Sequence, residues 1–234
     1  MATSLSTVQQ PGEKTMAQTT RLKKVGAIAA IAFPVMQMIS QGLIQIGGVE
    51  PAFAAPASEI ASFFQDRNPT LFSIGGYISL LSIVAFLWFL GALWDELRAA
   101  EGGSGWLSVV AVASGLVAVS TITSPGGWPL AVFRIEEGLD PQIARLLFDQ
   151  GNLNFANYWV ALGSMLLAVG LIAWQSHRFP GWMGWGSLVV GIGLLAARAV
   201  WTSAIAFTPY VLFWLWLILF GAMLLRRGRQ ESAR

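Results

Sequence analysis

Six long apolar stretches take up most of this 234-residue chain. They run roughly over 25–48, 70–94, 105–123, 153–175, 182–204 and 210–225. About 20 predominantly apolar residues cross the hydrocarbon core of a bilayer as a helix, and only the last stretch is marginal by this measure. Charged residues make up 11% of the chain, against about 25% in soluble domains. The pattern predicts an all-α integral membrane protein, a bundle of six transmembrane helices.

The chain divides into one membrane domain and two short tails. Residues 1–20 are polar and rich in Ser, Thr and Gln without periodicity, which predicts a disordered cytoplasmic tail. Residues 21–228 hold the six-helix domain, and 229–234 form a basic cytoplasmic tail. Little is left for a soluble domain.

The distribution of Lys and Arg predicts the orientation of the bundle. Cytoplasmic loops of membrane proteins carry an excess of Lys and Arg. If the N-terminus is cytoplasmic, the loops on that side hold ten basic residues and the outer loops three, which are Arg67, Arg134 and Arg145. Both termini are therefore expected in the cytoplasm, and the long loops 49–69 and 124–152 outside.

Each long loop contains a short amphipathic segment. In 58–66, Ile60, Phe63 and Phe64 fall on one helical face, and Ser58 is a suitable N-cap. In 140–150, Asp140 is the expected cap and Pro141 the first helical residue. Two short helices are predicted, which either rest on lipid headgroups or cover the mouth of the bundle.

The first apolar stretch carries Gln37, Gln41 and Gln45 at intervals of four residues. Residues at this spacing share a helix face, so we expect one polar track climbing towards Glu50. Because an unsatisfied amide in hydrocarbon costs several kcal/mol, the track should face the bundle. Either the amides hydrogen-bond between helices, or they line a cavity open to the outside.

Arg198 is the one charged residue well inside a predicted span, in LLAARAVWTSAIAF. Three interpretations stay open: snorkelling towards the interface marked by Trp201, pairing with Glu50, Asp66 or Glu136, or an anion or headgroup site. Tyr77 and Asn157 lie in the outer halves of other helices. The candidate ligand-binding set is Gln37, Gln41, Gln45, Tyr77, Asn157 and Arg198.

Several kinds of chemistry lack their residues. The chain has no Cys and a single His, His177 beside Arg178 in a cytoplasmic turn. Thiolate metal sites, bis-histidine haem ligation and a Ser-His-Asp triad are thereby excluded. No phosphate-binding glycine loop occurs. We expect no cofactor, no metal and no nucleic acid, and name membrane lipids, a second copy of the chain or another membrane subunit as partners.

Two stretches, PASEIASFFQDRNPTLFSIGGYISLLSIVAFLWFLGALWDELRAAEGG at 56–103 and FPGWMGWGSLVVGIGLL at 179–195, carry a resemblance. They resemble a family of bacterial membrane proteins common in actinobacteria, the domain of unknown function 4386. The similarity covers most of 25–226. It implies a six-span bundle in a bacterial inner membrane, and it brings no catalytic residues.

Three functions remain in competition. The first is binding of a lipid or other amphipathic ligand in an outward-facing polar pocket, or a role as accessory subunit, with the two outer helices capping Gln37, Gln41, Gln45 and Arg198. The second is an intramembrane lipid- or isoprenoid-modifying enzyme, which requires Glu50, Glu59 or Asp66 in an aromatic-lined cavity as a general acid. The third, a small transporter, would show inverted repeats and broken helices, for which Pro34 alone offers little.

Overall fold

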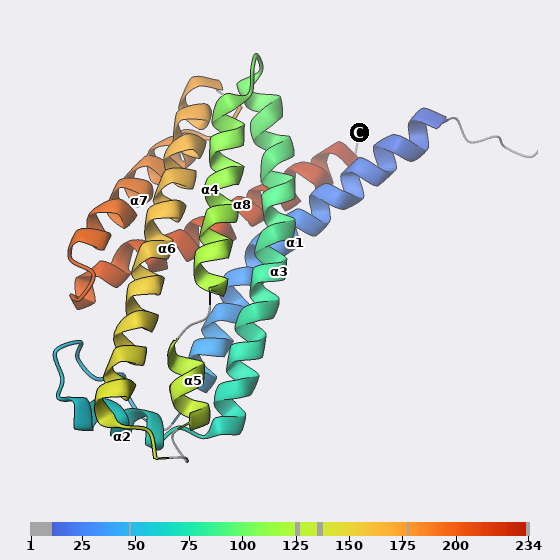
Figure 1. The fold of residues 1–234 in the computed structure, drawn as a ribbon. Coiled ribbons are helices and arrows are strands. Elements are labelled where there is room, and N and C mark those ends of the chain that lie inside the picture. Colours follow the sequence, from blue (N-terminus) through green and yellow to red (C-terminus); the bar gives the residue numbers. More distant parts are fainter. Residues whose placement is uncertain (1–10, 47, 125–126, 135–137, 177, 233–234) are drawn as a thin grey trace, which may run out of the picture.

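The computed structural model describes residues 11–46, 48–124, 127–134, 138–176 and 178–232, and all its regular elements are helices (Figure 1). The long helices are α1 (Pro11–Ile44), α3 (Pro69–Glu101), α4 (Trp106–Thr123), α6 (Pro141–Ser176), α7 (Gly181–Ala199) and α8 (Thr208–Ser232). Shorter elements are α2 (Ala57–Gln65), α5 (Gly127–Arg134) and the 3-10 helix η2 (Ala204–Phe207). Six helical segments of the described chain are long and apolar enough to cross a membrane, as the sequence predicts.

The six long helices pack in a closed ring. Going round it, α1 contacts α3, followed by α4, α6, α7 and α8, which returns to α1. Glycines allow the helices to approach each other closely. A Cβ at Gly191 of α7 would lie 3.0 Å from the Gly163 carbonyl oxygen of α6. The aromatic centre of the bundle is built from Phe33, Phe86, Phe89, Phe213, Trp216 and Phe220.

Helix boundaries follow from local capping. The Asn68 side chain accepts a hydrogen bond from the Leu71 N–H at 3.0 Å, with Pro69 as the first residue of α3. Asp140 accepts one from the Gln142 N–H at 2.7 Å ahead of α6, which confirms its predicted capping role. At the other end of α3, the Glu101 carboxylate accepts from the Leu107 and Ser108 N–H groups at 2.9 and 2.8 Å and so caps α4.

A second hydrophobic cluster lies at one end of the bundle, where Figure 1 shows α2 and α5 side by side with the start of α6. We call it the cap. Its buried residues are Ala55, Ile60, Ala61, Phe63, Phe64, Phe72, Ala131, Val132, Ala144 and Phe148. Because α6 has 36 residues, it is about 54 Å long and exceeds a hydrocarbon core of about 30 Å. The excess length of α6 therefore supplies one side of the cap.

Two sequence predictions need correction. The separate short helix expected over 140–150 is wrong, because these residues are the first turns of α6. Gly151 does not break the helix, since its bare backbone lies directly against the Trp128 indole of α5. Residues 11–20, expected in a disordered tail, belong to α1, while 1–10 lie outside the described residues.

The end opposite the cap carries a network of charges. Glu96 of α3 lies 3.0 Å from Lys23 Nζ of α1 and 3.7 Å from Arg227 Nη1 of α8. The same Arg227 donates to the Arg178 carbonyl at 2.6 Å. These contacts tie three helices of the ring together at that end.

Candidate functional site

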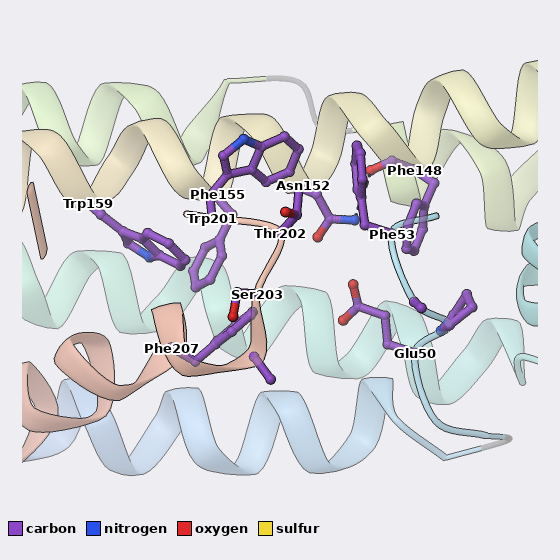
Figure 2. Close-up of a pocket in the computed structure, with 13 residues that line it drawn as sticks. Glu50, Phe53, Phe148, Asn152, Phe155, Trp159, Trp201, Thr202, Ser203 and Phe207 are labelled. Carbon is purple, nitrogen blue, oxygen red and sulfur yellow. Dashed lines mark hydrogen bonds between the residues drawn. The ribbon is translucent and has the colours of Figure 1, made fainter. Parts of the chain in front are cut away.

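A cavity of about 230 Å³ lies next to the cap, between three segments that are far apart in sequence (Figure 2). The first is the chain after α1, at 50–53; the second is one face of α6; the third is the connection from α7 to α8 through η2. Its lining residues are Glu50, Pro51, Ala52, Phe53, Phe148, Asn152, Phe155, Trp159, Trp201, Thr202, Ser203, Ala204 and Phe207. Among them, Glu50 is the single residue with a formal charge.

The α6 wall consists of Phe148, Asn152, Phe155 and Trp159. Steps of four, three and four residues keep side chains on one helix face, so regular helix geometry alone brings these four together. Phe148 and Trp159 are almost fully buried, at 0% and 1% exposure. The wall is thus a fixed apolar surface with one amide set into it.

Glu50 enters the cavity from the opposite side. The turn before it uses Gly48 with φ of 147°, a conformation that L side chains rarely adopt. Figure 2 shows the Glu50 carboxyl directed towards the Asn152 side chain, whose Nδ2 donates to the Phe148 carbonyl at 3.2 Å. Partial burial raises the pKa of Glu50, while the Asn152 amide and the charge of Arg67 act in the opposite direction.

Arg67 lies behind Glu50 and outside the cavity lining. It is 4% exposed, and its Nη1 donates to the Ile44 carbonyl at 3.0 Å and to the Ile46 carbonyl at 3.4 Å. These acceptors belong to the last turn of α1 and the residues after it, which have no helical donor of their own. The guanidinium also stacks over the Phe63 ring at 3.9 Å. Burial lowers the pKa of Arg67, and the charges of Glu50 and Asp66 oppose that shift.

The aromatic side chains of the cavity meet mostly edge to face. Phe53 and Trp201 have ring centroids 4.6 Å apart at an interplanar angle of 69°. Trp159 makes similar contacts with Phe155 at 5.3 Å and Phe207 at 5.6 Å. The Trp159 Nε1–H is buried and has no acceptor among the described residues. The exposed residues Thr202, Ser203 and Ala204 form the mouth.

The three glutamines of α1 do not form a common track. Gln37 is 4% exposed and donates to Ser82 Oγ at 2.8 Å and Ser79 Oγ at 3.3 Å on α3. Gln41 is exposed and Gln45 is half-buried. Four helical residues turn through about 400°, so each step drifts by about 40° and the track leaves the interface. Gln37 is therefore an interhelical contact, and the expectation that all three face inward is wrong for Gln41.

The remaining polar candidates lie apart from the cavity. Tyr77 is 63% exposed. Arg198 Nε donates to Asn157 Oδ1 at 2.9 Å, and its guanidinium carbon lies 5.9 Å from the centre of the Trp201 ring. Asn157 and Arg198 are thus brought together, but neither lines the cavity. Glu136, one suggested partner of Arg198, lies outside the described residues.

Of the three carboxylates considered for catalysis, the structure brings one to the cavity. Glu59 and Asp66 are exposed on and just after α2, whereas Glu50 lines the cavity. Sequence reasoning missed Asn152, Phe148 and Phe155. The spacing of Phe148, Asn152, Phe155 and Trp159 was the available signal, and it was hidden because 140–150 was treated as a separate helix.

No family model, no curated protein and no solved structure matches this chain. The resemblance to the domain of unknown function 4386 consequently remains a prediction.

Proposed function

We propose that this chain is a multi-pass protein of a bacterial cytoplasmic membrane that binds an amphipathic ligand in the Glu50 cavity. Both termini face the cytoplasm in this proposal, as the distribution of Lys and Arg favours, so the cavity opens on the outer side. Membrane lipids are the proposed partners. The observation that supports it is a carboxyl group and an amide, Glu50 and Asn152, set into an otherwise aromatic wall.

The size of the cavity agrees with partial enclosure of a lipid. Sites for drug-sized ligands measure about 300–1,000 Å³, whereas this cavity has about 230 Å³. A headgroup or one end of a small amphipath fits such a volume, and the chain of the ligand would continue past Thr202 and Ser203.

The test is native mass spectrometry with lipid analysis on protein purified in mild detergent. Wild type is compared with Glu50→Gln combined with Asn152→Leu, and with Glu59→Gln as the matched control on the exposed face of α2. One lipid class should copurify with wild type and the control and be lost from the double variant. Equal occupancy in all three proteins, each still folded, would place the ligand elsewhere and contradict the proposal.

A second candidate function is lipid or isoprenoid modification with Glu50 as general acid. The observation that favours it is the burial that raises the pKa of Glu50 beside aromatic walls, since a catalytic acid must keep its proton near working pH. Incubating the copurified lipid with wild type should then yield a product of altered mass, and Glu50→Gln should stop its formation. If the mass of the lipid is unchanged after incubation with wild type, the result supports binding alone.

A further inference from the structure

The charges around the cavity are unevenly placed. Among its lining residues Glu50 alone is charged, and it is an acid. The two nearby cations are engaged elsewhere: Arg67 on the carbonyls of Ile44 and Ile46, and Arg198 on Asn157. A negatively charged ligand would thus meet the Glu50 carboxylate directly and find no cation in the lining. The charge of the lining therefore favours a positively charged group over an anion.

The walls add a second reason for a cationic ligand. The faces of aromatic rings carry negative potential and attract ammonium groups within about 6 Å, with Trp the most effective. Six of the thirteen lining residues are aromatic: Phe53, Phe148, Phe155, Trp159, Trp201 and Phe207. Aromatic rings therefore make up much of the wall that a ligand beside the Glu50 carboxylate would meet.

The protein already uses this interaction on both sides of the site. Arg67 stacks on Phe63 at 3.9 Å, and Arg198 approaches Trp201 at 5.9 Å. Burial raises the pKa of Glu50, and the charge of Arg67 opposes that shift. An ammonium group inside the cavity would add a second, closer partner for that carboxylate and displace little else.

From these observations we infer that the ligand of the cavity carries an organic ammonium head group, held between the Glu50 carboxylate and the faces of the surrounding aromatic rings. This inference rests on the proposed function and names its ligand class. The ammonium belongs to an amphipathic molecule whose apolar chain leaves through the mouth at Thr202 and Ser203. A free organic cation without an apolar chain would present the same ammonium group to the cavity.

Three probes with the same twelve-carbon chain separate the possibilities: dodecyltrimethylammonium, dodecanol and laurate. Each is titrated into purified protein in maltoside micelles and read by native mass spectrometry. Dodecyltrimethylammonium should bind most tightly, and its Kd should rise at least about tenfold in Glu50→Gln and in Trp201→Leu, separately. Glu59→Gln and Trp185→Leu, exposed residues away from the cavity, are the matched controls and should stay within about twofold.

Competition with tetramethylammonium identifies the source of the cation. Displacement of the dodecyl probe means that a free cation suffices, and retention with Glu50 dependence intact means that the ammonium of a lipid is required. The inference is overturned if dodecanol or laurate binds as tightly as the ammonium probe, or if both cavity variants leave the Kd of the ammonium probe unchanged. In that case the proposed function, binding of an amphipathic ligand, is not contradicted. If no probe binds wild type, the proposed function fails as well.

Discussion

Replacing Arg67 by Met should destabilise the protein by about 3 kcal/mol or more, because it removes the donor of two carbonyls and the cation on the Phe63 ring. The side chain is 4% exposed and donates to two carbonyls, those of Ile44 and Ile46. Each carbonyl left without a donor costs about 1 to 3 kcal/mol. Loss of the stack on Phe63 removes about 1 to 2 kcal/mol more. The Glu50 carboxylate also loses its compensating cation.

Two further variants separate charge from hydrogen bonding. Arg67→Lys keeps the positive charge but lacks the planar guanidinium that lies over the Phe63 ring while its Nη1 donates to both carbonyls, so it should recover less than half of the loss. Arg67→Met introduced together with Glu50→Gln should cost about 1 to 2 kcal/mol less than Arg67→Met alone, because the neutral amide needs no cation.

The assay is reversible unfolding in mixed micelles of maltoside and dodecyl sulfate, followed by circular dichroism. Arg226→Met, at an exposed position on α8, is the control and should change the free energy of unfolding by less than about 0.5 kcal/mol. A loss below about 1 kcal/mol for Arg67→Met, or strict additivity with Glu50→Gln, would refute the view that Arg67 anchors α1 and compensates Glu50.

Three other predictions concern the rest of the molecule. Glu50→Gln should raise the melting temperature at pH 8 but not at pH 4. Burial raises the pKa of Glu50 above its ordinary value of 4.5. The wild type therefore loses stability as the pH rises from 4.5 through the folded-state pKa, and the variant does not. Gln37→Leu should cost about 1 kcal/mol in the micelle assay by removing its hydrogen bonds to α3, whereas exposed Gln41→Leu should stay within about 0.5 kcal/mol, and equal losses would contradict this. Because the chain has no native Cys, Ser62→Cys and Ser104→Cys give clean reporters of orientation, and an impermeant maleimide should label only the first in intact cells.

The membrane spans could be predicted because hydrophobic length is a local property of the sequence. The described helices reproduce all six, with α3 and α6 longer than expected. The extra turns of α6 could not be foreseen from hydropathy, since they bury an apolar face with Ala144 and Phe148 in the cap instead of in lipid. Those of α3, over 95–101, lie at the opposite end and include Glu96 of the charge network. The helical segment over 141–150 was detected for the same local reason, but not its continuation through Gly151 into the rest of α6.

The site was only partly predictable, because it depends on contacts between distant segments. Glu50 was a candidate from its position in an outer loop, yet nothing local distinguished it from Glu59. Its partner Asn152 becomes visible only once the first turns of α6 are known to continue the helix. The glutamines of α1 misled for a geometric reason: a step of four residues turns about 40° past the starting face, and Gln41, one step from the buried Gln37, is already exposed.

The cavity also has a consequence for how the protein is made. Its parts enter the membrane in order, with Glu50 and Phe53 first, the α6 face next and Trp201 last. About 150 residues separate Glu50 from Trp201, so at synthesis rates of about 5 to 20 residues per second Trp201 is added about 8 to 30 s after Glu50. During that interval the nascent chain lacks part of the cavity lining. Under the proposed function, ligand capture therefore requires the chain up to at least Phe207, and a chain stopped before Trp201 would insert most of its helices without the complete cavity lining.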